Sequence, residues 1–147
     1  MTTTTIITKP NKAFWIIAVL ALVWNLIGLF FWISEYFLMT EEMRATLPPE
    51  QVELMNNAPI WSMYVYAIAV FTGVLASVLL LMRKKLAVTI FGISLLAILI
   101  IQGYWIFAMD IVGVMGPQSL IMPLIVIAIA IFEYYYSKGA ARNGWLV

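Results

Sequence analysis

Four long apolar runs, separated by short polar segments, dominate the pattern of this chain. They cover approximately residues 14–38, 60–82, 86–109 and 119–136. A helix needs about 20 apolar residues to cross a bilayer, and a helix satisfies all of its backbone hydrogen bonds within its own segment. The pattern therefore predicts an all-α integral membrane protein with four transmembrane helices, built as a single membrane domain over residues 1–147.

The composition agrees with a membrane protein and excludes several kinds of chemistry. Of the 147 residues, 65% are hydrophobic and 10% are charged, whereas soluble domains have about 45–50% and 25%. A net charge of +1 argues against a nucleic-acid partner, which would require a clustered basic face. The chain has no Cys and no His, which excludes thiolate and imidazole catalysis and the common zinc and haem ligands. We expect no metal, no cofactor and no enzymatic activity.

The charged residues predict an orientation. Seven of the 8 basic residues fall on one side of the predicted membrane: Lys9, Lys12, Arg83, Lys84, Lys85, Lys138 and Arg142. Only Arg44 lies on the other side, among acidic residues. By the positive-inside rule, both termini are expected in the cytoplasm of a multi-pass protein.

The short connection "MRKK" at residues 82–85 makes two predictions. The runs that it joins should be neighbours in an antiparallel bundle, because so short a turn leaves them little freedom. Its basic side chains, Arg83, Lys84 and Lys85, should contact anionic lipid headgroups, at about 1 kcal/mol per charge.

The outer loop, residues 40–59, carries helix signals of its own. Thr40 followed by "EEMRATL" is typical of an N-cap with acidic residues in the first turn. Pro49 suits the first position of a second helical turn. We expect a short amphipathic helical segment that covers the outer surface, with a solvated connector as the alternative.

The first apolar run contains a polar seam. Asn25, Gly28, Trp32 and Glu35 follow steps of three and four residues, which place them on one helix face. Helix interfaces in lipid favour small residues and interhelical hydrogen bonds, so the seam should face the bundle. Asn25 falls near the middle of the bilayer. It is either an interhelical clamp or an amide that binds a polar substrate in a central cavity.

Glu35 falls near the outer interface, and two interpretations stay open for it. It either reaches the surface and pairs with Arg44, or handles a proton or cation at the mouth of a cavity. Gln102 in the third run should approach a level between Asn25 and Glu35, among aromatic side chains that form a small-molecule site or an interfacial belt. Glu133 is expected to form an ion pair with nearby basic residues at the cytoplasmic interface.

The second run contains the small-residue pattern Ala69, Gly73 and Ser77. This pattern lets two helix backbones approach closely. It predicts a contact surface either for the first run or for a partner, which would be a second copy or another protein of a membrane complex.

Four segments resemble a family of small bacterial four-span proteins. They are "WIIAVLALVWNLIGL" (15–29), "MTEEMRATLP" (39–48), "MRKKLAVTIFGISLL" (82–96) and "YYYSKGAARNGWL" (134–146). Members of this family are mostly uncharacterised and are sometimes labelled "sugar transporter". The resemblance covers nearly the whole chain and implies a four-helix bundle in a bacterial inner membrane. It assigns no functional residues.

Three functions are compatible with these features. The expected one is a non-enzymatic accessory or lipid-interacting bundle whose partners are membrane lipids. The first alternative is a transporter of a small molecule, sugar-like or cation-coupled, with a cavity in the outer half. The second is a lipid- or quinone-modifying enzyme with Glu35 or Asp110 as acid or base, for which the chain offers the fewest suitable groups.

Overall fold

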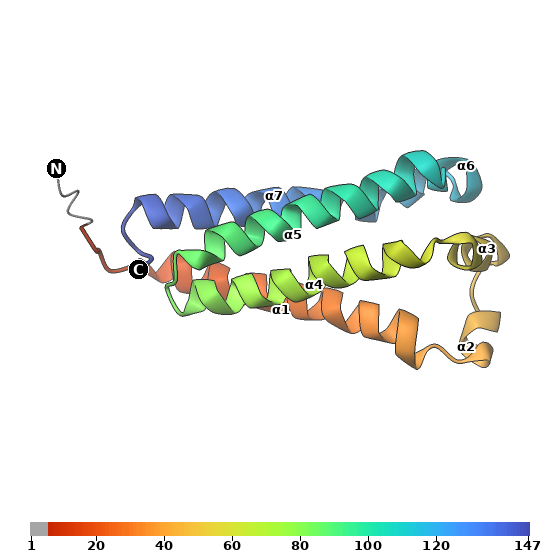
Figure 1. Cartoon of the computed structure of the whole chain (residues 1–147), viewed down its shortest axis with the longest axis horizontal. Helices are drawn as coiled ribbons and strands as arrows, with labels where there is room; N and C mark the ends of the chain where they lie inside the picture. Colours follow the sequence, from red (N-terminus) through yellow and green to blue (C-terminus); the bar gives the residue numbers. More distant parts are fainter. Residues whose placement is uncertain (1–5) are drawn as a thin grey trace.

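The computed structural model describes residues 6–147, and this part of the chain is helical, with no strand. Four long helices lie side by side (Figure 1). They are α1 (Lys12–Ile33) with its π-helical continuation η1 (Ser34–Leu38), α4 (Ile60–Leu81), α5 (Leu86–Gly103) with its π-helical continuation η2 (Tyr104–Ala108), and α7 (Ile121–Arg142). Shorter elements connect them: α2 (Glu41–Ala45), α3 (Pro49–Asn57), α6 (Ile111–Met115) and the 3₁₀ turn η3 (Pro117–Leu120).

The bundle has two different ends. We call the end that holds the C-terminus, the start of α1 and the turn at residues 82–85 the terminal end, and the end that holds α2, α3 and α6 the loop end (Figure 1). Helix α4 packs against both α1 and α5, and α5 packs against α7. The prediction that residues 82–85 join two neighbouring helices is therefore confirmed.

The long helices have the length and composition to cross a membrane, as the four apolar runs predicted. Helix α1 alone has 22 residues, which at 1.5 Å per residue is about 33 Å, against a hydrocarbon core of about 30 Å. Helix α7 runs well past the predicted end at residue 136, to Arg142. It continues because Ser137 and Ala140 extend its buried face at the terminal end.

Small residues make up much of the interior of the bundle, beside a few large ones, and many large apolar residues are exposed on its outside. Ala18, Ala76 and Ala87 are fully buried, whereas Leu20 and Phe30 are each 60% exposed. A protein in water buries its large apolar side chains, so this distribution suits a bundle whose outer surface contacts lipid.

The small residues of α4 are used within the chain. Ala69, Gly73 and Ser77 are all buried, and Ser94 of α5 donates a hydrogen bond to the carbonyl of Ala69 at 2.8 Å. Of the two uses expected of this pattern, the structure shows the contact within the chain. While the bundle is intact, its own helices cover them.

The connection from η1 to α4 contains two short helices. The Thr40 side chain accepts a hydrogen bond from the backbone N–H of Met43 at 3.2 Å, and Pro49 is the first residue of α3. The predicted N-cap and the predicted proline position are therefore both confirmed. Helix α6 was not predicted. It begins after Asp110, whose left-handed backbone (φ 48°) lets its carboxylate accept a hydrogen bond from the N–H of Gly113 at 3.2 Å.

At the terminal end of the bundle, Arg83 is hydrogen-bonded to segments near both termini of the chain. Its guanidinium donates to the carbonyl of Trp145 at 2.8 Å and to that of Thr8 at 3.0 Å. The backbone N–H of Thr8 also donates to the carbonyl of Gly144 at 2.9 Å. The Arg83 side chain is therefore hydrogen-bonded to the protein's own backbone, and the lipid-headgroup contact expected of residues 83–85 stays a prediction. Lys84 and Lys85 are exposed beside it.

Candidate functional site

Three polar side chains from three helices meet inside the bundle, and we call Asn25, Ser77 and Glu133 the polar centre. The amide nitrogen of Asn25 lies 3.1 Å from Ser77 Oγ and 3.2 and 3.0 Å from the two carboxylate oxygens of Glu133. It also donates to the carbonyl of Ala21 at 2.8 Å. An amide NH₂ has two hydrogens, so these acceptors share them.

Gly73 makes room for the polar centre. A Cβ atom at position 73 would clash with the amide oxygen of Asn25, so only glycine lets the Asn25 side chain lie directly against α4. Ser77 is 0% exposed and donates its own hydroxyl to the carbonyl of Gly73 at 2.8 Å. Polar groups at this depth are therefore paired with one another.

The position of Glu133 contradicts the sequence prediction of an interfacial ion pair. Its side chain is 7% exposed and is hydrogen-bonded to Asn25. Lys138 instead lies over the ring of Tyr134, 5.9 Å from its centroid. The cause is helix phase: Glu133 shares the buried face of α7 with Ala130, Ser137 and Ala140. Their spacing of three and four residues was the available signal.

The polar centre joins α1 and α7. Apart from it, these two helices pack less closely than α1 with α4, α4 with α5 or α5 with α7. Among the described residues, α1 and α7 are not one of the extensively contacting pairs. The space left beside Asn25 and Glu133 measures ≈ 10 Å³, which holds about one water molecule. This geometry favours the interhelical clamp for Asn25 over a substrate amide.

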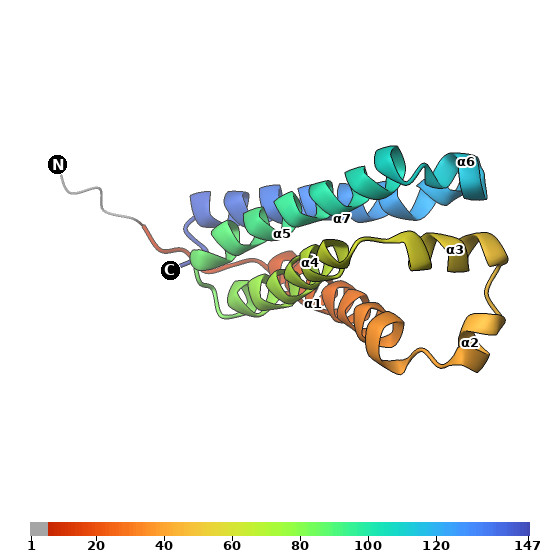
Figure 2. The same ribbon diagram turned by 45° about the vertical axis from the view of Figure 1, so that its right-hand side comes forward.

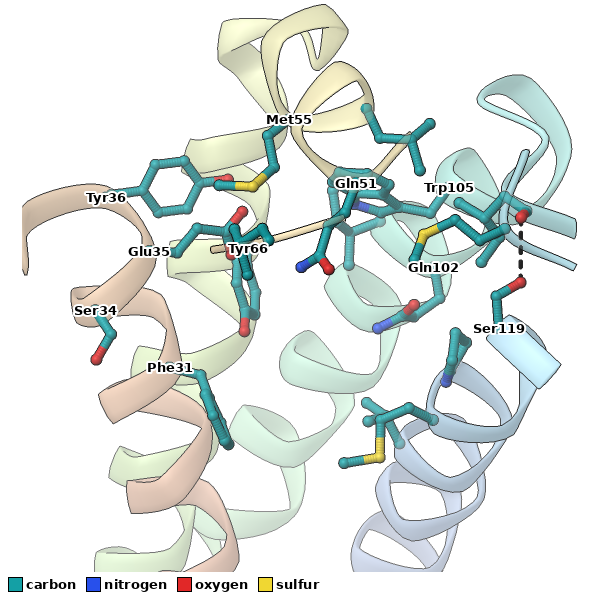
Figure 3. A pocket seen from close by; sticks show the side chains of 18 of the residues that line it. Phe31, Ser34, Glu35, Tyr36, Gln51, Met55, Tyr66, Gln102, Trp105 and Ser119 are labelled. Atoms are coloured by element: carbon teal, nitrogen blue, oxygen red, sulfur yellow. Dashed lines mark hydrogen bonds between the residues drawn. The ribbon is translucent and has the colours of Figure 1, made fainter. Parts of the chain in front are cut away.

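A much larger cavity lies at the loop end, and we call it the loop-end cavity. Its volume is ≈ 660 Å³, within the range of about 300–1,000 Å³ for small-molecule sites. It lies between α1 with η1 on one side and α5, η2 and α7 on the other, while α3 covers it (Figure 3). Figure 2 shows α1 diverging from α5 and α7 toward this end, whereas α4 stays in contact with η2, since the ring centroids of Trp61 and Tyr104 lie 4.7 Å apart.

The polar side chains of the loop-end cavity gather at its upper part. Figure 3 shows Glu35, Tyr36 and Tyr66 on one wall and Gln102 and Trp105 on the other. Deeper in the bundle the lining is apolar and includes residues from three helices: Phe31, Ile101 and Val126. The deep lining is therefore apolar, and the polar groups lie higher, among apolar side chains of α3 such as Leu54 and Met55.

Both π-helical segments contribute to the loop-end cavity. Glu35 and Tyr36 belong to η1, and Trp105 belongs to η2. A π turn inserts an extra residue and changes which side chains face inward, and such turns are frequent at functional sites. Neither segment carries a sequence signal, such as a proline, that would have revealed it.

Glu35 faces this cavity without a protein partner. Within residues 6–147 its carboxylate makes no hydrogen bond or ion pair, and no buried polar atom there lacks a partner, so its oxygens reach open space. Arg44, the expected partner, donates instead to Asn56 Oδ1 at 2.5 Å. Arg44 lines a smaller neighbouring cavity of ≈ 240 Å³, which Glu35 and Tyr36 also border.

The structure separates the five residues predicted to form one polar seam or cavity. Glu35 and Gln102 line the loop-end cavity, and Asn25 lies in the polar centre. Gly28 packs next to Val70, where an added Cβ would lie 3.6 Å from a methyl group. Trp32 is 8% exposed and donates its indole N–H to the carbonyl of Met63 at 3.2 Å.

Sequence reasoning missed several polar residues of the loop-end cavity, namely Ser34, Tyr36, Gln51 and Ser119. Tyr66 on α4 belongs to the aromatic group that was expected to form either a small-molecule site or an interfacial belt. Gln51 comes from α3, and its approach to the cavity depends on how the connection folds back over the helices.

No family model, curated protein or solved structure matches this chain. The resemblance to small bacterial four-span proteins therefore stays a prediction. Within residues 6–147, no group of three or more His, Cys, Asp or Glu side chains could hold a metal ion.

Proposed function

We propose that this protein is an antiparallel four-helix bundle of a bacterial inner membrane and that it binds an amphipathic molecule in the loop-end cavity without transforming it. Both termini lie in the cytoplasm, which places the loop end at the outer face. The basic residues at the terminal end support this orientation. The apolar outer surface of the bundle supports its insertion.

The observation that carries the proposal is the loop-end cavity itself. Its volume of ≈ 660 Å³ has room for a small-molecule ligand. Its deep lining is apolar, and its polar groups lie nearer the loops among apolar side chains of α3. An amphipathic molecule matches this order, with its head near Glu35 and Gln102 and its chain near Phe31 and Val126.

The route into the cavity supports a ligand that comes from the bilayer. Helices α1 and α7 both line it, and they are held to each other at the polar centre rather than by extensive packing. Toward the loop end α1 diverges from α5 and α7 (Figure 2). A chain already dissolved in lipid can therefore enter sideways between α1 and α7.

A photoreactive lipid tests this proposal. The protein is placed in nanodiscs with a phospholipid that carries a diazirine near the middle of its acyl chain, and labelled residues are mapped by mass spectrometry. Ile101 is the reporter, because it lines the cavity and is only 3% exposed, so lipid around the bundle does not reach it. We expect labelling of Ile101 in addition to labelling of the outer surface.

A matched pair of variants on α7 provides the control. Met122 lines the cavity and Leu124 does not, and each is 55% exposed. Met122→Trp should reduce Ile101 labelling several-fold, because the indole occupies part of the cavity, and Leu124→Trp should leave it unchanged. Absence of Ile101 labelling in the natural sequence, in a protein that remains folded, contradicts the proposal.

Transport is a second candidate that one observation favours. Val126 lines both the loop-end cavity and the small space beside Asn25 and Glu133, so the two spaces adjoin at this side chain. A transporter should move its substrate across proteoliposome membranes, and Glu35→Gln should abolish that flux. Normal flux in the Glu35→Gln protein would remove Glu35 from a transport mechanism.

A further inference from the structure

We infer that the ligand of the loop-end cavity carries a cationic head, of the ammonium class, and that Glu35 and the aromatic rings around it recognise this charge. The inference rests on the proposed function. It adds the chemical class of the head, which is what distinguishes the ligand from the surrounding lipid.

The polar head of the ligand must supply most of the selectivity of the cavity for this ligand over the surrounding lipid. An acyl chain that moves from lipid into an apolar cavity gains no hydrophobic free energy, because both surroundings are apolar. The chain-lining residues Phe31, Ile101 and Val126 therefore fix the position of a chain without selecting it. Recognition depends on the polar groups near the loops.

The charge at these polar groups is negative. Among the described residues that line the loop-end cavity, Glu35 is the one with a formal charge. Arg44 makes no ion pair with Glu35, because its guanidinium donates to Asn56 and lines the neighbouring cavity rather than this one. An anionic head would meet uncompensated repulsion there, whereas a cationic head would pair with the carboxylate.

The surroundings of Glu35 strengthen a pairing with a cation. The carboxylate lies half-buried in a mostly apolar space and has no protein partner within residues 6–147. A half-buried carboxylate keeps only part of its hydration, so an opposite charge or a donor that reaches it is favoured. A ligand cation would be the partner of Glu35, just as Asn25 is the partner of Glu133 at the polar centre.

Aromatic rings stand on both sides of the same space. Tyr36 and Tyr66 lie beside Glu35, with ring centroids 6.5 Å apart and planes inclined at 66°. Trp105 lies on the opposite wall (Figure 3). Ring faces attract ammonium groups by about 0.5–2 kcal/mol, depending on how dry the site is. A carboxylate and aromatic rings that line one cavity are a combination suited to ammonium recognition.

Three probes with the same diazirine-bearing alkyl chain test the inference. Their heads are trimethylammonium, sulfate and glucoside, and the natural full-length protein is held in nanodiscs of zwitterionic lipid. The readout is the ratio of label on Ile101, inside the cavity, to label on Phe30, which is 60% exposed on the outside of α1. The ratio cancels differences in how the probes partition into the nanodisc.

We expect the trimethylammonium probe to give a ratio about tenfold higher than the glucoside probe, which corresponds to about 1.4 kcal/mol. The sulfate probe should give the lowest ratio. Glu35→Gln should reduce the trimethylammonium ratio to that of the glucoside. Glu53→Gln, which removes an exposed acid of α3 that does not line the cavity, should leave the ratio unchanged.

The possible outcomes distinguish the inference of a cationic head from the proposed function of binding an amphipathic molecule. Equal Ile101 labelling by all three probes, unaffected by Glu35→Gln, overturns the cationic head and leaves the amphiphile-binding function standing. A preference for sulfate also overturns the inference. If no probe labels Ile101 in the natural sequence, both proposals fail.

Two sources could supply an ammonium head, namely a lipid of the membrane or a free cationic amphiphile. Diazirine-bearing phosphatidylethanolamine and phosphatidylglycerol with identical chains distinguish them. A higher Ile101 ratio for phosphatidylethanolamine supports the inference with a membrane lipid as ligand. Equal ratios for these two lipids, together with a high trimethylammonium ratio, support it with a free amphiphile as ligand.

Discussion

The polar centre and the loop-end cavity each contain one carboxylate from a long apolar helix, yet their surroundings differ completely. Glu133 is buried against an amide that donates to both of its oxygens, with ≈ 10 Å³ of free space beside it. Glu35 faces ≈ 660 Å³ and has no protein partner within residues 6–147. A satisfied polar group holds helices together, whereas an unsatisfied one beside a cavity is available to a ligand.

The largest expected effect on stability comes from the polar centre. Asn25→Leu removes the donor of Glu133 and leaves a buried carboxylate unpaired. We expect the free energy of unfolding to fall by about 3 kcal/mol, the upper part of the range for such a loss. Denaturation with increasing SDS in mixed detergent micelles measures it.

The double variant Asn25→Leu/Glu133→Leu is the sharper form of this experiment. Because both partners become apolar, most of the lost stability should return. Ser77 keeps its own bond to the carbonyl of Gly73 at 2.8 Å. If the double variant is less stable than Asn25→Leu alone, the two residues do not act as a hydrogen-bonded pair.

A pair of glycine variants gives a smaller effect. Gly73→Ala places a methyl group against the Asn25 side chain. We expect the free energy of unfolding to fall by about 2 kcal/mol, because the site is overpacked and hydrogen bonds are broken. Gly103→Ala is the control, because a Cβ atom at that position meets nothing within 4 Å. Equal stability of the two variants in the same SDS titration would mean that Asn25 does not lie against Gly73.

The smallest effect on stability is expected at the loop-end cavity. Glu35→Leu breaks no hydrogen bond to another described residue, so the free energy of unfolding should change by no more than about 0.5 kcal/mol. The same variant should lose the preference for the trimethylammonium probe. A loss of stability as large as that of Asn25→Leu would place Glu35 among the structural residues and remove the contrast between the two regions.

The sequence was enough to predict the four long helices and the helix signals of Thr40 and Pro49. Those features depend on local composition and spacing, and local spacing also placed Asn25 on an inward face. The partner of Asn25 was not predictable in the same way. Glu133 is 108 positions away, and the pairing depends on how α1 and α7 are placed by the helices between them.

The loop-end cavity was the least predictable part. Whether Glu35 lines it depends on the π turn of η1 and on the fold of α3 over the bundle, and neither follows from hydrophobic periodicity. The expected grouping of Glu35 with Trp32 also failed for this reason. Trp32 lies just before the π turn and bonds to the backbone of α4, while Glu35 lies within the turn and faces the cavity.

A crystal structure grown from a lipid phase tests the contrast between the two regions most directly. We predict elongated non-protein density between α1 and α7, with its apolar part against Phe31 and Val126 and its head beside Glu35. No such density should lie beside Asn25, whose amide should contact Glu133. A loop-end cavity filled by protein side chains, or a ligand inserted between Asn25 and Glu133, would contradict this account.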